Sequence, residues 1–184
     1  MAEKSTSSKS KSKTSAKTAE SEGQESYFFF YGNKSPFSQH YPVKFSVDGV
    51  VYNCAEQYMM YSKAALFKDE GMKQKIMSTD DPVKQKKFGR QVQNFEKDVW
   101  NKAAVEVVKT ASKAKFDQNE ELRKQLFGTY PKVLVEASPR DRIWGIGLGA
   151  SNPKALNKAN WRGRNKLGYT LTEVRNELMK DYES

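Results

Sequence analysis

A long amphipathic segment, from Glu96 to about Lys115, constrains the fold of this chain more than any other feature. Its apolar residues recur at the three- and four-residue spacing of an α-helix: Trp100, Ala103, Ala104, Val107, Val108 and Ala111. A helix with such a stripe is stabilised mainly by packing the stripe against other elements. We therefore expect a domain whose core is built mainly from helices.

Capping and stop signals predict further helices on both sides of this segment. Asp80-Asp81-Pro82 opens one, because aspartate caps a helix and proline fits its first position. Asn53 is the predicted N-cap of another, which runs to about Phe67. Two more are expected, over Asp117–Phe127 before Gly128 and from Leu171 to about Lys180.

Strand signals are few and short, and most of them come early. The aromatic run Tyr27–Tyr31 predicts a buried strand, and Val133–Val135 predicts a later one. Val43–Val47 and Val50–Tyr52 flank Asp48-Gly49, a strong signal for a hairpin. The fold expected for residues 27–184 is therefore a single α-rich domain, mainly α with a small N-terminal β component.

Residues 1–26 differ from the rest of the chain. They are mostly Lys, Ser, Thr, Ala and Glu without apolar periodicity, which predicts a disordered tail. The tail is either a solubilising extension or an arm for nuclear import or nucleic-acid contact. It lacks the apolar region of a secretory signal, and no apolar run approaches the ~20 residues of a membrane span. We expect an intracellular protein, cytoplasmic or nuclear, that does not bind membranes.

The net charge belongs to the folded part of the chain. The sequence has 32 basic and 22 acidic residues, and the tail holds only five lysines and four glutamates. Residues 27–184 therefore carry about +9, which favours an anionic partner: a nucleotide, a phosphosugar or a nucleic acid. A single histidine, His40, and a single cysteine, Cys54, leave too few ligands for a typical metal site. We predict no metal and no cofactor.

The predicted helix after Asn53 holds the best catalytic candidates. Glu56 and Lys63 lie seven residues apart, hence on one face and about 10 Å apart along the axis. This separation is long for an ion pair but suits two groups that hold a sugar between them. The position near the helix start favours Glu56 as a carboxylate. The structural alternative is that Glu56 completes a capping box with Asn53 and that Lys63 is an ordinary solvated lysine.

Three later features could bind a ligand. In the loop from Trp144 to Asn165, glycines at 145, 147 and 149 would let backbone approach a ligand, Trp144 offers a stacking face, and Asp141 could hold hydroxyl groups. Trp161–Lys166 and Arg90 could bind phosphate. The alternatives are a packed turn, a solvated basic loop and a helix-surface cation.

Read in order, these elements and several shorter fragments resemble the YbiA/NADAR superfamily over about residues 28–180. The matching fragments are Pro36-Phe37-Ser38, Asp48-Gly49, Glu56-Gln57-Tyr58, Lys63, Phe88-Gly89-Arg90, Trp100, Lys115-Phe116, Leu122-Arg123, Leu126, Leu134-Val135-Glu136, Asp141, Trp144-Gly145, Gly147 and Asn165–Tyr169. Each fragment is unspecific, but their shared order is not. Where relatives often have Asn after Phe-Ser, this chain has Gln39, which could change a contact to the ribose or the base.

The resemblance implies an α-rich domain that hydrolyses N-glycosidic bonds. It implies Glu56 as the catalytic glutamate and Lys63 as a lysine that, in relatives acting on ADP-ribose, attacks the anomeric carbon as an amine. A cation such as Arg90 or Arg164 would assist this attack by lowering the pKa of the lysine. The implied pocket residues are Arg90, Asp141, Trp144, Gly145, Gly147 and Asn165.

Three functions remain open at this point. The preferred one is removal of ADP-ribose from ADP-ribosylated guanine bases in DNA or RNA, which suits a basic domain. The second is N-glycoside cleavage of phosphorylated intermediates of riboflavin biosynthesis. The third is a non-catalytic, basic nucleic-acid-binding module.

Overall fold

Helices make up most of residues 25–184, the part of the chain that this computed structural model describes. They are α1 (Ala55–Leu66), α2 (Glu70–Met77), α3 (Pro82–Gly89), α4 (Lys97–Gln118), α5 (Glu120–Phe127) and α6 (Lys166–Glu183). The strands are β1 (Tyr27–Phe30), β2 (Phe45–Val47), β3 (Val50–Tyr52) and β4 (Val133–Glu136). The predicted α-rich fold with a small β component is confirmed. The predicted disordered tail, apart from Glu25 and Ser26, lies outside the described residues.

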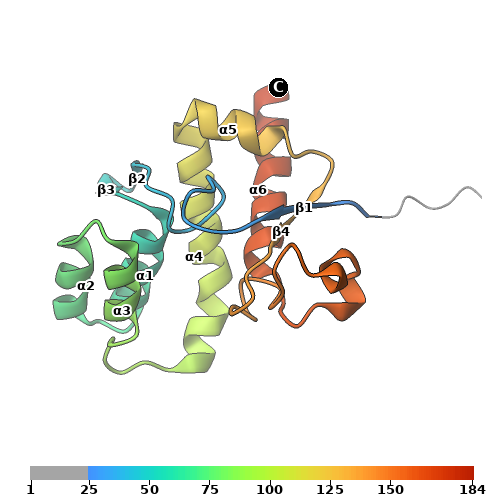
Figure 1. Cartoon of the computed structure of the whole chain (residues 1–184). Coiled ribbons are helices and arrows are strands. Elements are labelled where there is room, and N and C mark those ends of the chain that lie inside the picture. The colour runs from blue at the N-terminus through green and yellow to red at the C-terminus, as the bar shows by residue number, and fades with distance from the viewer. Residues whose placement is uncertain (1–24) are drawn as a thin grey trace, which may run out of the picture.

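The long helix α4 forms the centre of the domain, as its apolar stripe predicted. Figure 1 shows α4 beside α6, with α1, α2 and α3 on one flank and the orange loop that precedes α6 on the other. The main core is continuous across α1, α4, α6 and the strands β1 and β4, with Met60, Trp100, Phe116, Leu134 and Leu171 among its buried members. None of the helices in the described range is long and apolar enough to cross a membrane.

The four strands form two separate pairs. The hairpin of β2 and β3 is confirmed, and both of its turn residues, Asp48 and Gly49, have positive φ angles of 51° and 79°. The second pair is parallel and was not predicted: β1 lies against β4, with Tyr27 opposite Val133. Just before β1, the carbonyl of Ser26 accepts a hydrogen bond from the amide of Val133, so the contacts of this strand begin inside the predicted tail.

Side chains of the α6 segment satisfy the backbone of β4. The side-chain amide of Asn165 accepts a hydrogen bond from the Glu136 N–H through Oδ1 and donates one to the Leu134 carbonyl through Nδ2, both at 3.0 Å. The hydroxyl of Thr172 accepts one from the Leu134 N–H at 3.0 Å. Helix α6 therefore begins at Lys166, five residues before the predicted start at Leu171, because these contacts hold its first turn against the strand.

The start of α1 corrects the predicted capping arrangement. The N-cap is Cys54 and not Asn53, so Glu56 is the second helical residue and completes no capping box. Gln57 takes the role expected of Glu56, since its Oε1 accepts a hydrogen bond from the Asn53 N–H at 2.8 Å. Cys54 is buried, and its thiol donates to Oε1 of Gln85 at 3.1 Å. Helix geometry therefore leaves the Glu56 carboxyl free for another role.

Other boundaries differ in smaller ways. Helix α3 begins at Pro82 with Asp81 as its cap, as predicted. Helix α4 continues to Gln118, so α5 starts at Glu120 and not at Asp117. Helix α2 was not predicted, because only Ile76 in it is buried and its apolar pattern is weak. The loop before α6 also contains two short 3-10 helices, Pro153–Leu156 and Lys158–Asn160.

The contact between α6 and β4 predicts an unusual response to alanine at Gly168. A Cβ atom there would overlap the Leu134 carbonyl oxygen and the Asn165 amide. Although Gly→Ala inside a helix normally stabilises by roughly 0.5–1 kcal/mol, we expect Gly168→Ala to lower the free energy of unfolding by roughly 1–3 kcal/mol. Denaturant unfolding measures the change.

Gly71→Ala is the matched control, because Gly71 is also helical and the nearest atom to its added Cβ is Oδ1 of Asp69 at 3.7 Å. This variant should unfold at the same or a slightly higher denaturant concentration than the wild type. Equal behaviour of the two variants would contradict the close approach of α6 and β4.

Candidate active site

Glu56 is a buried acid at the start of α1, with only 6% of its surface exposed. Burial raises its pKa to about 7, Asp141 adds to the rise, and the charges of Lys86, Lys63 and Arg90 oppose it. The helix start was expected to favour the carboxylate form of Glu56, but loss of hydration outweighs this effect. Near neutral pH the carboxyl can both hold and release a proton.

Lys63 is the second catalytic candidate on the same face of α1. Its Nζ lies 4.5 Å from the centre of the Phe95 ring and 6.0 Å from the centre of the Trp100 ring. Burial lowers the pKa of Lys63, Glu56 opposes this shift and Arg90 reinforces it. The charges of Glu56 and Arg90 thus both act on the pKa of Lys63, and the three residues form one electrostatic group. Arg164, the other predicted cation, is not among the charges that act on Lys63.

The Asp141 segment forms a tight turn beside this group. Oδ1 of Asp141 accepts hydrogen bonds from the N–H groups of Ile143 at 2.9 Å and Trp144 at 2.8 Å. An added Cβ at Gly145 would lie 3.0 Å from the carbonyl oxygens of Asp141 and Glu136. These contacts are sufficient to explain why the turn has an aspartate at position 141 and a glycine at position 145. The charge of Asp141 nevertheless also acts on the pKa of Glu56.

Exposed arginines border the turn. Gly147 has a φ of +69°, and an added Cβ there would lie 2.9 Å from Cβ of Arg162 and 3.3 Å from Cγ of Arg142. The N–H of Arg164 donates to the carbonyl of Arg142 at 3.0 Å. All three arginines are exposed. Gly147 therefore allows Arg142 and Arg162 to approach each other, and a cationic surface forms beside Asp141.

Two predicted pocket residues are engaged in the protein interior. Asn165 is fully buried, and its side-chain amide is occupied by the backbone of β4. Trp144 is half-buried and packs against the main core. The Trp161 ring packs on Tyr27 with centroids 5.1 Å apart, and its Nε1 donates to the Ala155 carbonyl at 2.8 Å. We infer that Asn165 and Trp161 hold the loop in place and leave direct contact with a ligand to their neighbours.

Sequence reasoning missed three ionisable residues that surround Glu56. Nε2 of His40 lies 3.8 Å from Oε2 of Glu56. Lys86, one turn after Pro82 on α3, is the strongest charge opposing the raised pKa of Glu56. Burial also raises the pKa of Glu136, at the end of β4, to about 7, with further contributions from Asp141 and Glu56. No simple spacing rule links these residues, because they come from a loop, a helix and a strand.

A buried lysine supports the loop that carries His40. Lys115 is 1% exposed, and its Nζ donates to the Ser38 carbonyl at 3.1 Å. Burial lowers its pKa to about 7. Gln39, which follows Ser38, accepts a hydrogen bond from the Glu56 N–H on its backbone carbonyl at 2.9 Å. Its side-chain Nε2 is buried without a hydrogen-bond partner in the described part of the chain. The loop is therefore tied to both α4 and the start of α1.

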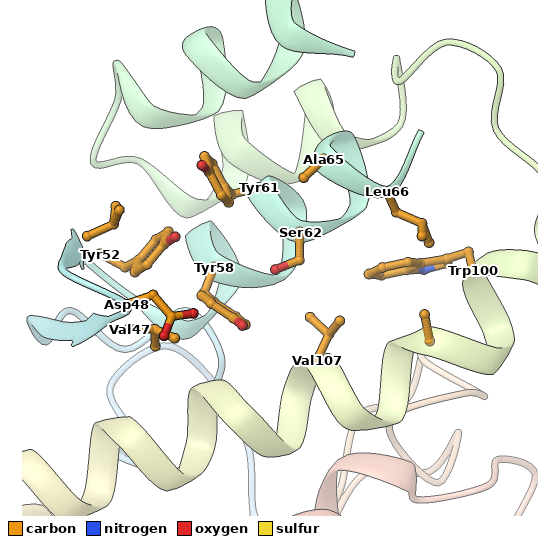
Figure 2. A pocket seen from close by; sticks show the side chains of 12 residues that line it. Val47, Asp48, Tyr52, Tyr58, Tyr61, Ser62, Ala65, Leu66, Trp100 and Val107 are labelled. Atoms are coloured by element: carbon orange, nitrogen blue, oxygen red, sulfur yellow. The ribbon is translucent and has the colours of Figure 1, made fainter. Parts of the chain in front are cut away.

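Two hollows open on different sides of α1. One, of about 520 Å³, is lined by Asn33, Lys34, His40, Tyr41, Pro42 and Pro82 and so adjoins the Glu56 group. The other, of about 490 Å³, lies between α1, α4 and the hairpin. Figure 2 shows Asp48 and Tyr58 at one end of this second groove and Trp100 and Leu66 at the other. It contains neither Glu56 nor Lys63, which lie on the opposite face of α1.

Comparisons with known proteins identify the family. Residues 28–179 match the NADAR domain. N-glycosidase R617 of Acanthamoeba polyphaga mimivirus is 42% identical over 164 residues, which cover 83% of this chain and 96% of that protein. The riboflavin biosynthesis protein VVA0006 of Vibrio vulnificus is 29% identical over 159 residues, 85% of this chain and 40% of that protein.

The fold agrees with this assignment. The NMR structure of the E. coli protein YbiA superimposes with a TM-score of 0.72 at 28% sequence identity, covering 88% of this chain and 90% of that one. The family match runs from β1 into α6. The chain therefore belongs to the NADAR family.

Proposed function

We propose that this protein hydrolyses N-glycosidic bonds and that its substrate is guanine carrying ADP-ribose in nucleic acid. The observation that carries the proposal is the group formed by Glu56 and Lys63, a buried acid and a half-buried amine whose pKa values are shifted toward neutrality from opposite sides. Such paired shifts cluster at catalytic sites and argue against the alternative of a non-catalytic binding module. Relatives named N-glycosidase support the reaction type.

The two groups suit complementary steps. The Lys63 amine attacks the anomeric carbon, and the bond to the base breaks with its electron pair moving to the base nitrogen, which takes up a proton. Opening of the sugar ring leaves an imine between Lys63 and the sugar. Glu56 stabilises the positive charge that develops at the anomeric carbon, then accepts a proton from the water that hydrolyses the imine. Free ADP-ribose and the amine result.

The exposed arginines favour the ADP-ribose substrate over a smaller phosphosugar. Arg142, Arg162 and Arg164 lie beside the turn of Asp141, whose charge reaches Glu56. Their guanidinium groups match the pyrophosphate of ADP-ribose and the phosphates of a nucleic acid. The relative named a riboflavin biosynthesis protein supports the second candidate, a phosphorylated riboflavin intermediate, which has fewer phosphates to bind.

Release of ADP-ribose from ADP-ribosylated guanine in DNA and RNA tests the substrate. We expect release from one or both, and a KM that rises with salt. The double variant Arg142→Gln/Arg162→Gln should raise KM severalfold while kcat stays nearly constant, because these side chains bind phosphate away from the reacting bond. Turnover confined to phosphorylated riboflavin intermediates would replace the first substrate with the second.

Glu56→Gln should lower turnover by at least about 100-fold and should stabilise the fold at the same time. The folded pKa of about 7 lies above the ordinary value of 4.5, so ionisation of Glu56 destabilises the native state increasingly between these values and fully above them. Glutamine avoids this cost. We expect the variant to be more stable than the wild type by up to about 3 kcal/mol near pH 8 and equally stable near pH 4.

Activity assays and denaturant unfolding at the two pH values measure both effects. A variant that is inactive and also less stable near pH 8 would show that Glu56 supports the fold, contrary to the proposal.

Lys63→Arg should abolish turnover and covalent trapping, because a guanidinium stays protonated and cannot attack the sugar. In the wild type, borohydride added during turnover should reduce the imine and attach the ADP-ribose unit to the peptide that contains Lys63. Mass spectrometry detects the adduct. Lys87→Arg, at an exposed site on α3, is the control and should trap normally. Full activity of Lys63→Arg without any adduct in the wild type would favour direct attack by water.

A further inference from the structure

His40 connects the buried acid to the hollow on its side of α1. Its Nε2 is 3.8 Å from Oε2 of Glu56, and its side chain, 28% exposed, forms part of the wall of the 520 Å³ hollow. The separation is slightly longer than a hydrogen bond, and such contacts often tighten when a substrate binds. His40, the one histidine of the chain, therefore stands between Glu56 and the hollow.

The hollow itself has the chemistry of a nucleobase site. Pro42, Pro82 and Tyr41 offer flat apolar surfaces for a planar ring, while Asn33 and Lys34 offer hydrogen-bond donors. Guanine presents two adjacent acceptors on one edge, O6 and N7, to which lysine commonly donates. The volume of the hollow, about 520 Å³, lies within the usual range for small-molecule sites.

The charges around His40 fix how the pair holds its proton. Lys86 on α3 faces both members, Asp81 faces His40, and the other charges that act on Glu56 come from Lys63 on α1, Arg90 after α3 and Asp141 in its turn. Glu136 on β4 also interacts with Glu56. Burial lowers the pKa of His40 and raises that of Glu56, so both shifts favour the state in which Glu56 holds the proton and His40 is neutral.

We propose that the hollow beside His40 binds the departing guanine base and that His40 protonates it. As the bond between the anomeric carbon and the base nitrogen breaks, its electron pair stays on the nitrogen, and the proton held by Glu56 passes to Nε2 of His40 and from there to the base. Glu56, now a carboxylate, later accepts a proton from the attacking water, so each turnover consumes one water and leaves the pair unchanged. The inference rests on the proposed function, because the base subsite belongs to that reaction.

Kinetics of His40→Gln test the proton transfer. In the wild type we expect a bell-shaped pH dependence of kcat, because the pair must hold one proton and only one. The variant should lose about 100-fold in kcat with KM changed little, lose the fall in rate at high pH, and regain activity when free imidazole is added. Lys34→Gln should raise KM with kcat retained. Tyr58→Phe, in the groove on the other face of α1, is the control and should match the wild type.

Nuclear magnetic resonance tests the base subsite without any turnover. The untagged chain has one histidine, so the ring signals of His40 are unambiguous. We expect guanosine to shift them, and Glu56→Gln to change the pH at which they titrate. An active wild type whose His40→Gln variant keeps its kcat and its pH profile would overturn the proton transfer.

Unmoved His40 signals at saturating guanosine would overturn the base subsite. A wild type that releases no ADP-ribose from guanine would refute the proposed function separately. In that case the guanosine titration still decides whether the hollow binds a base.

Discussion

The hydrogen bonds of Asn165 determine how the two halves of the site meet. Its side chain binds the backbone along one edge of β4 at Leu134 and Glu136, and its own N–H donates to the Gly145 carbonyl at 3.1 Å. It adopts a left-handed conformation with a φ of +50°, which asparagine tolerates better than most residues. One buried amide thus joins the strand that ends in Glu136, the turn of Asp141 and the start of α6.

The opposite half of the site is held in a similar way by a buried lysine. Lys115 on α4 binds the Ser38 carbonyl, and Gln39 binds the first turn of α1 through its backbone. The loop that contains Ser38 and Gln39 places His40 beside Glu56. Burial then sets the chemistry, because it raises the pKa of the acid and lowers that of the nearby amine, Lys63. The reactive groups owe their properties to the exclusion of water, and the helix start has less influence.

Elements fixed by neighbouring residues could be predicted from the sequence, whereas those fixed by contacts between distant residues could not. Local signals were sufficient for α3, with its Asp81 cap, and for the hairpin turn at Asp48-Gly49. The parallel pairing of β1 with β4 depends on contacts between distant parts of the chain, so no local pattern could reveal it. Helix α2 escaped prediction because a helix with one buried residue has hardly any apolar stripe.

The candidate site shows the same division. The shared face of Glu56 and Lys63 follows from helical spacing, whereas His40, Lys86 and Glu136 reach Glu56 from three separate segments. Asn165 was assigned by resemblance and the turn glycines were noticed by their spacing, but the reasons for them, a satisfied strand backbone and close approach of neighbouring atoms, exist only in three dimensions.

The buried Cys54 at the start of α1 has a consequence for redox chemistry. Burial raises the pKa of its thiol to about 11, so hardly any of it is ionised to the reactive thiolate at neutral pH. Because this is the only cysteine of the chain, oxidants and electrophiles meet almost no reactive sulfur. The helix that carries both catalytic candidates is therefore insulated from thiol oxidation, and a cysteine introduced on the surface would react alone with a thiol-specific label.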